Sequence, residues 1–210
     1  MILQRFTQLL LPRNCVFCGT RCAARLPPVC SGCLDDLPWR TALLTEGEAP
    51  FEVTAALFNY AFPVDAALKA LKFRHRLDYV PAFAALLARV FPELPQDIDA
   101  LLPVPLHWRR HAQRGFNQAV ELCRELQAST GLPMRCNIRR VRATPYQSGL
   151  EAEARSANLR AAFAARSHVP SQHLLIVDDV ITTGATCREL ASAALAAGAA
   201  KVSVLAVART

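Results

Sequence analysis

One segment of 13 residues constrains the fold of this 210-residue chain more than any other. Residues 174–186 read LLIVDDVITTGAT. The aliphatic run Leu174–Val177 is typical of a strand buried in a parallel sheet. Asp178 and Asp179 follow at its predicted carboxyl end, where open α/β sheets bind their ligands. The segment therefore predicts a buried strand, an acidic pair, a small-residue turn and a helix, in that order.

The turn in this segment has the composition of a phosphate site. Its residues are Thr182, Thr183, Gly184, Ala185 and Thr186. Free backbone N–H groups and the helix dipole at such a turn stabilise an anion. The end of a strand followed by the cap of a helix would also explain these residues, because Thr and Asp are common capping residues. The complete order favours a sugar-phosphate site, in which the carboxylates meet sugar hydroxyls or a hydrated cation. It is neither a P-loop nor a G-x-G-x-x-G fingerprint.

The rest of the chain alternates strands and helices. We expect strands at 53–60, 100–104 and 201–207, and helices at 64–73, 78–91 and 185–197. A basic loop is expected at 107–114, followed by an amphipathic helix that opens at residues 115–117. Repeated alternation of this kind predicts an α/β fold with a mainly parallel sheet and helices on both faces.

The predicted basic loop carries three candidate anion ligands, Arg109, Arg110 and Arg114. A pyrophosphate needs a clamp on a different loop from the sugar phosphate, and forked guanidinium groups suit it. A solvated basic face is the alternative. His107 and His111 are expected to be surface or capping histidines. Trp108 could stack on a base, but we expect it to fill a hood or a seam between domains.

Cysteines concentrate near the amino terminus, where five of the eight lie in the first 33 residues. Cys15-x-x-Cys18 and Cys30-x-x-Cys33 have the spacing of a zinc ribbon or treble clef. Four cysteine ligands make a closed, structural zinc site. Disulfides compete with this interpretation, but they are disfavoured in a reducing compartment. Cys22 is left over, either as a substitute ligand or as a free thiol.

Composition shifts divide the chain into an amino-terminal helix with the zinc-binding module, residues 1–45, and an α/β domain, residues 46–210. No apolar run is long enough to span a bilayer, and residues 1–12 lack a signal-peptide cleavage site. A cytoplasmic location is therefore expected. The net charge of +7 makes anionic ligands or nucleic acid plausible partners, although a bias towards Ala and Arg would also explain it.

Taken together, these motifs resemble the ComF family. The resemblance rests on the CxxC pair, LKF at 71–73, PVPLHWRRHAQRGFNQA at 103–119, RATPYQSGLEAEARSANLRAAF at 142–163 and LLIVDDVITTGATCREL at 174–190. It implies a domain like the type I phosphoribosyltransferases with an amino-terminal zinc finger. It also implies a link to natural competence, in which incoming single-stranded DNA is handled at the cytoplasmic side of the membrane.

The resemblance further implies roles for individual residues towards phosphoribosyl pyrophosphate (PRPP). Asp178 and Asp179, the candidate catalytic residues, would meet the ribose 2′- and 3′-hydroxyls, directly or through Mg²⁺. Residues 182–186 would wrap the 5-phosphate. The three arginines and Lys72 are candidates for the pyrophosphate. The polar stretch 142–158 lies where type I phosphoribosyltransferases carry a flexible lid, and a plain surface loop is equally compatible with its residues. Nothing in the sequence names an acceptor.

Three functions fit these expectations. The first is a phosphoribosyltransferase with an unknown acceptor, which acts by positioning and by charge stabilisation. The second is a DNA-uptake factor that binds PRPP only as a ligand and contacts single-stranded DNA or DNA-uptake proteins. The third is a structural adaptor with a vestigial site, which the intact acidic pair and turn disfavour.

Overall fold

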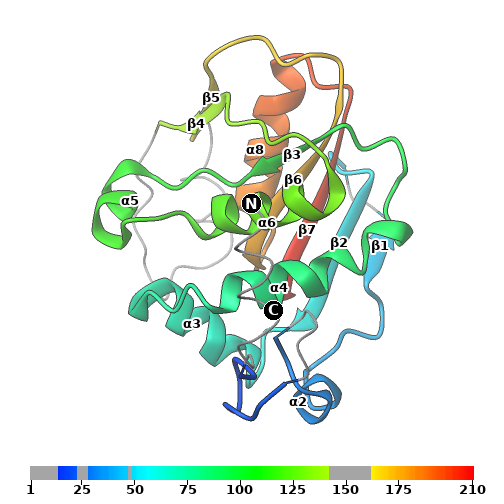
Figure 1. Ribbon diagram of the computed structural model, residues 1–210. Coiled ribbons are helices and arrows are strands. Elements are labelled where there is room, and N and C mark those ends of the chain that lie inside the picture. The colour runs from blue at the N-terminus through cyan, green and yellow to red at the C-terminus, as the bar shows by residue number, and fades with distance from the viewer. Residues whose placement is uncertain (1–13, 23–27, 47–48, 142–161) are drawn as a thin grey trace, which may run out of the picture.

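The computed structural model describes residues 14–22, 28–46, 49–141 and 162–210. Its centre is a five-stranded sheet (Figure 1). In spatial order the strands are β1 (Leu44–Glu46), β2 (Val53–Asn59), β7 (Lys201–Arg209), β6 (His173–Ile181) and β3 (Ala100–Pro103). β2, β7, β6 and β3 are parallel, and β1 pairs with β2 antiparallel. The predicted α/β class with a mainly parallel sheet is confirmed.

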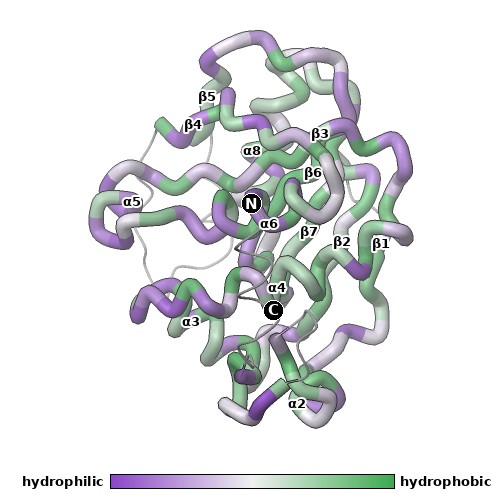
Figure 2. Tube along the Cα trace, in the orientation of Figure 1, coloured by the Kyte–Doolittle hydropathy of each residue, from purple (hydrophilic) through white to green (hydrophobic). Residues whose placement is uncertain are grey.

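Helices cover both faces of the sheet, as predicted. One face carries α3 (Val64–Arg74), α4 (Tyr79–Ala88) and α6 (Gln118–Thr130), and the other carries α8 (Ala185–Ala196) (Figure 1). A 3₁₀ turn, η1 (Phe91–Glu93), follows α4. The two faces form separate apolar layers, in which Phe83 and Leu205 belong to one and Leu190 and Val204 to the other. Figure 2 shows the hydrophobic residues in green along the strands and the helices.

The basic stretch predicted as a loop is instead a short helix, α5 (Trp108–Arg114). The imidazole Nδ1 of His107 accepts a hydrogen bond from the backbone N–H of Arg109 at 3.3 Å, which caps the amino end. Gly115 ends the helix in the left-handed conformation, with φ of 76°. The loop prediction was wrong because charge was given more weight than these two helix signals.

Two further differences bear on the site. β6 continues to Ile181 instead of ending at Val177, because Asp178, Val180 and Ile181 pair with β7. A two-stranded ribbon, β4 (Ile138–Arg140) with β5 (Phe163–Ala165), was not predicted. The lid expected at 142–158 and the helix expected at the amino terminus lie outside the described residues. In the described part of the chain, no helix has the length and apolarity needed to cross a membrane.

The cysteine-rich module packs directly on the α/β domain. It contains the short helix α2 (Ser31–Asp35). The ring centroid of Phe17 lies 5.7 Å from that of Tyr79 and 6.3 Å from that of Phe83, both on α4. Cys15 and Val29 are buried in the same apolar cluster as α4. The module and the domain therefore share one core.

Candidate functional site

The acidic pair, Asp178 and Asp179, lies near the end of β6, at the carboxyl edge of the sheet. Asp179 is 7% exposed, whereas Asp178 is partly exposed. The backbone N–H of Asp179 donates a hydrogen bond to Oδ1 of Asp178 at 2.8 Å. Two carboxylates held this close repel each other when both are ionised, so the pair favours a cation beside it.

Lys72 on α3 supplies one such cation. Its Nζ lies 2.6 Å from Oδ2 of Asp179, and both side chains are largely buried. Lys72 and Asp179 are 107 positions apart in the sequence, yet the fold brings them together. Lys72 was a predicted pyrophosphate ligand, and its ammonium group pairs with Asp179.

Burial and charge both act on Asp178. Removal from water is the largest cause that raises the pKa of its carboxyl, the neighbouring charge of Asp179 also raises it, and Lys72 lowers it, so that the pKa lies at about 8. A buried carboxyl prefers its neutral form for this reason. Perturbed carboxyl groups of this kind gather at functional sites.

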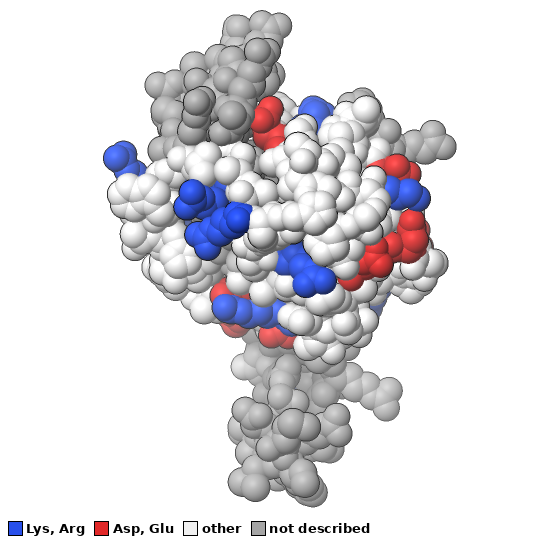
Figure 3. All heavy atoms as spheres, turned by 90° about the horizontal axis from the view of Figure 1, so that it is seen from above, with Lys and Arg blue, Asp and Glu red and all other residues white. Residues whose placement is uncertain are grey.

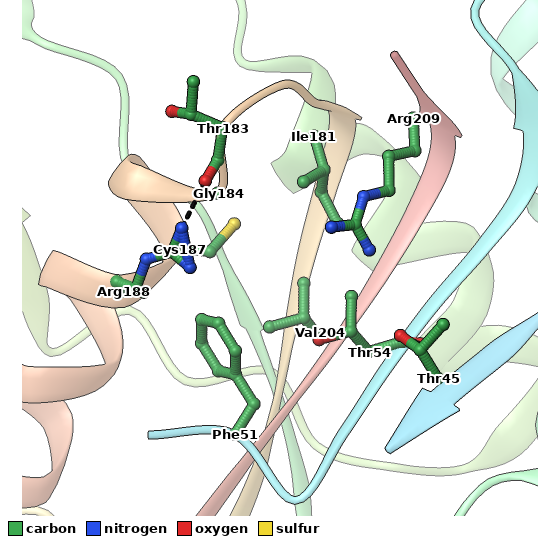
Figure 4. Close-up of a pocket in the computed structure, with 10 residues that line it drawn as sticks. All are labelled: Thr45, Phe51, Thr54, Ile181, Thr183, Gly184, Cys187, Arg188, Val204 and Arg209. Carbon is green, nitrogen blue, oxygen red and sulfur yellow. Dashed lines mark hydrogen bonds between the residues drawn. The ribbon is translucent and has the colours of Figure 1, made fainter. Parts of the chain in front are cut away.

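The predicted phosphate turn joins β6 to α8. Thr182 and Thr183 are exposed, and Gly184 adopts the left-handed conformation with φ of 72°. The hydroxyl of Thr183 accepts from the backbone N–H of Ala185 at 3.4 Å. Arg188 reaches back from α8, and its guanidinium donates to the carbonyl oxygen of Thr183 (Figure 4). The conformation of the turn thus depends on Gly184, which tolerates a positive φ, and is stabilised by the hydrogen bond from Arg188.

The three predicted arginines occupy different environments. Arg114 is partly buried, and its guanidinium donates a hydrogen bond to Oε1 of Gln118 at 2.8 Å. Burial lowers the pKa of Arg114, Asp179 raises it, and the charge of Arg110 lowers it. Arg109 is exposed, with its guanidinium carbon 5.3 Å from the ring centroid of Trp108.

Trp108 does not fill a hood or seam, because its side chain is 66% exposed. The helix that carries this residue, α5, lies at the left side of the molecule in Figure 1. His107 is a capping histidine, as one of the two alternatives predicted, but it is buried rather than on the surface. Burial lowers the pKa of His107, as do the charges of Arg140, Arg109 and Arg110.

Arg140 on β4 is a site residue that sequence reasoning missed. Burial lowers the pKa of its guanidinium, the charge of Arg110 lowers it further, and Asp178 raises it. The guanidinium carbon lies 5.6 Å from the ring centroid of Phe163 on β5. Only the packing of the β4–β5 ribbon brings Arg140 near Asp178, so no local pattern marked it. The carboxyl edge thus combines two carboxylates with Lys72, Arg114 and Arg140.

A small cavity of about 160 Å³ lies beside the phosphate turn, between α8 and the β1–β2 hairpin (Figure 4). Thr183, Gly184 and Arg188 form its wall on the side of the turn, and Arg209 extends into it from the end of β7. Thr45 and Thr54 add hydroxyl groups from the hairpin. The turn is therefore open to solvent from this side as well.

The four cysteines of the two CxxC pairs lie together. The Sγ atoms of Cys15, Cys18, Cys30 and Cys33 are all within 4.8 Å of one another. The Sγ atoms of Cys18 and Cys30 are 3.6 Å apart, far beyond a disulfide bond. A tetrahedron of Zn–S bonds places sulfurs about 3.8 Å apart, so the cluster could hold zinc. Cys22 is not part of this group.

Comparison with known proteins identifies the family. The chain is 36% identical over 205 residues to the DNA utilization protein YhgH of Salmonella typhimurium, and the match covers 93% of this chain and 84% of that protein. It is 27% identical over 213 residues to competence protein F of Haemophilus influenzae, covering 96% and 93%. The competence protein ComFC of Bacillus subtilis is 25% identical over 174 residues, covering 82% and 67%. The chain belongs to the ComF family.

Other comparisons add less. No protein-family model matches this ComF-family chain. Among solved structures, the glutamine PRPP amidotransferase of B. subtilis is similar over 66% of this chain and 30% of that one, with 20% identity and a TM-score of 0.43.

Proposed function

We propose that the carboxyl edge of the sheet binds PRPP with Mg²⁺. The observation that carries this proposal is the acidic pair of Asp178 and Asp179, which lies two residues before the phosphate turn and in which the buried Asp179 pairs with Lys72 at 2.6 Å. Residues 182–186 would hold the 5-phosphate, and the carboxylates would hold the ribose hydroxyls, directly or through the metal ion. Arg109, Arg110, Arg114 and Lys72 are the candidates for the pyrophosphate, and the position of Arg140 beside Asp178 adds it to them.

The residues fit such a ligand chemically. Carboxylate oxygens are the ligands that Mg²⁺ prefers, and guanidinium groups form bidentate contacts with phosphates. Bound Mg²⁺ would neutralise the charge of the pyrophosphate. The protein's own contribution would be to orient the ribose on the acidic pair and to hold the pyrophosphate between arginines. Transfer of a phosphoribosyl group to an unidentified acceptor would then follow from positioning and charge stabilisation.

Calorimetric titration of PRPP with Mg²⁺ into the zinc-loaded protein tests this proposal. We expect Asp178→Asn/Asp179→Asn to abolish binding. The matched control is Asp35→Asn/Asp36→Asn, which removes an exposed pair of adjacent aspartates at the end of α2. Wild-type protein that binds no PRPP, or a control pair that loses binding equally, would contradict the proposal.

We also propose a role in DNA handling during natural competence, with single-stranded DNA and DNA-uptake proteins as partners. The names of the relatives, DNA utilization protein and competence protein, support this role. In that case PRPP could act as a ligand without turnover. Release of pyrophosphate on addition of candidate acceptors would separate the transferase from the ligand-regulated DNA-handling protein.

We propose that the cysteine cluster holds one structural zinc ion. Four thiolates fill all four positions of a tetrahedral site, which leaves no position for a substrate. Hydrogen bonding with Thr20 lowers the pKa of the Cys18 thiol to about 6, which favours the thiolate that zinc binds. Elemental analysis should find one zinc per chain.

A further inference from the structure

A second, wider hollow lies beyond the carboxyl end of β3, the edge strand of the sheet, where Pro103 lines it. This groove has a volume of about 870 Å³. Its walls come from α5, the outward side of α6 and the β4 strand, with Arg166 just beyond β5. The predicted phosphate turn, residues 182–186, does not line it. The groove is therefore a surface separate from the turn that would hold the 5-phosphate.

The groove is strongly basic. Four arginines line it, Arg124, Arg139, Arg140 and Arg166. Among the described residues that line it, Glu121 is the single acid, and its carboxylate pairs with Arg124. Arg139 and Arg166 are exposed. Basic side chains also cluster in the space-filling view from above (Figure 3). A groove of this charge favours an extended polyanion over a neutral ligand.

An exposed aromatic ring stands at the rim of the groove. Trp108 is 66% exposed and lines the groove together with the buried ring of Phe116. The guanidinium of Arg109 lies over the indole ring of Trp108. An aromatic platform beside arginines is the combination that binds single-stranded nucleic acid, because unpaired bases stack on the ring while cations contact the backbone. A duplex hides the faces of its bases and cannot use this platform.

We propose that this groove binds single-stranded DNA, with a base stacked on Trp108 and phosphates on Arg139 and Arg166. The inference rests on the proposed DNA-handling role and assigns it a surface. Arg140 lines the groove and also interacts with the charge of Asp178. A strand in the groove would therefore pass close to the proposed PRPP site.

Tryptophan fluorescence tests the stacking step directly, since the chain has two tryptophans. Trp39→Phe leaves Trp108 as the only reporter, and Trp108→Phe leaves Trp39, which packs on Phe58 and does not line the groove. Oligothymidylate should quench the first variant and leave the second unchanged. Trp108→Ala should weaken binding about tenfold, the size of one lost base–aromatic stack. DNA binding without quenching of Trp108 would overturn the proposal.

Salt dependence tests the phosphate contacts. Each contact with a single strand contributes roughly 0.7 to the slope of log affinity against log salt concentration. Arg139→Gln and Arg166→Gln should each reduce the slope by about this amount. Arg89→Gln is the matched control, because it removes an exposed arginine at the end of α4, outside the groove. Equal effects of all three substitutions would overturn the assignment of the groove.

The outcomes separate this inference from the proposed function. If the folded, zinc-loaded wild type binds no oligothymidylate, both the DNA-handling role and the groove are overturned. If it binds but the groove variants behave as wild type, the groove alone is overturned. Asp178→Asn/Asp179→Asn should lose PRPP and retain DNA, whereas Arg139→Gln and Arg166→Gln should retain PRPP. Correlated loss of both ligands in every variant would contradict two separate surfaces.

Discussion

Burial and the charge of Asp179 raise the pKa of Asp178 to about 8, which favours the neutral form of its carboxyl at pH 7. A ribose hydroxyl or a magnesium ion is held best by the ionised carboxylate. Binding at this residue therefore competes with its proton. The proposed site is set up so that its affinity depends on pH in the neutral range.

The affinity for PRPP with Mg²⁺ should rise with pH. Below a pKa of about 8 the carboxyl must lose a proton before it binds, so affinity should increase up to about tenfold per pH unit and level off above pH 8. Calorimetry between about pH 6 and pH 9, in buffers of different ionisation enthalpy, would detect the released proton. Asp178→Asn should remove this dependence. Constant affinity and no proton release in the wild type would show that Asp178 does not ionise on binding.

The raised pKa of Asp178 also affects the stability of the fold. Its effect is opposite to that of an aspartate whose pKa is lowered by folding. A carboxyl whose pKa is raised in the folded protein favours unfolding as the pH rises from about 4 towards 8. Asp178→Asn should therefore stabilise the fold at pH 8, by about 1–2 kcal/mol. Denaturant unfolding at pH 5 and pH 8 measures this gain, which should be smaller at pH 5. A substitution that destabilises at both pH values would contradict the shift.

His173 anchors a polar network at the amino ends of β6 and β7, in which His173 and Ser203 are buried and Asp97 is exposed. Its Nδ1 lies 2.8 Å from Oδ1 of Asp97, and its Nε2 lies 2.9 Å from Oγ of Ser203. The order of groups is that of a hydrolase triad, but Ser203 is fully buried, so no substrate reaches it. The network is structural, and nothing local in the sequence marked residues this far apart.

Ser203→Ala should destabilise the protein by about 1–3 kcal/mol, because it leaves a buried imidazole nitrogen without its partner. Chemical denaturation measures the change. Ser192→Ala on the exposed side of α8 is the control and should be nearly neutral. An equally small effect at Ser203 would mean that His173 finds another partner after the substitution.

At the scale of single elements, the junction of β6 and α8 depends on Gly184. Its φ of 72° is strained for any residue with a Cβ. Gly184→Ala should therefore lower stability by about 1 kcal/mol and also distort the turn proposed for the 5-phosphate. Gly131→Ala is the matched control, since Gly131 has φ of 77° at the end of α6 and lines no proposed site. Both variants should lose similar stability, and only Gly184→Ala should lose PRPP affinity.

The long elements could be predicted from the sequence, because each carries a clear period or an aliphatic run. β2 and α3 lie within one residue of their predicted bounds. α5 was missed because its seven residues are mostly charged or polar and carry no apolar face. β4 and β5 have three residues each, too few for alternation to be recognised.

The residues of the candidate site likewise divide into those that the sequence predicted and those that it did not. Asp178, Asp179 and the turn after them are contiguous, so one motif marked them all. Arg140 comes from the β4–β5 ribbon, and only tertiary structure brings it to Asp178. The exposed position of Trp108 follows from the unpredicted helix α5. Residues that reach a site by packing rather than by neighbouring sequence are the ones that sequence reasoning misses.

At the scale of the whole molecule, the cysteine-rich module is part of the main core. Phe17 packs on Tyr79 and Phe83 of α4, and Val29 is buried in the cluster that also contains Leu205 of the central strand β7. A small segment such as this one rarely folds without a metal ion or a partner surface. Here the proposed zinc ion and the contacts with α4 stabilise the module together. Loss of zinc should therefore also destabilise parts of the chain outside the module.

Removal of zinc should therefore destabilise the entire chain rather than the module alone. We expect a chelator, or Cys30→Ser, to lower stability by about 3–5 kcal/mol, the cost of losing a large aromatic side chain from a core, or roughly 10 °C in melting temperature. Hydrogen exchange should show lower protection in α4, where Phe83 loses its contact with Phe17. Cys136→Ser, which changes an exposed cysteine outside the cluster, is the control and should retain both zinc and protection. A metal-free protein with unchanged protection in α4 would show that the module folds without zinc and that the four thiols are not a structural site.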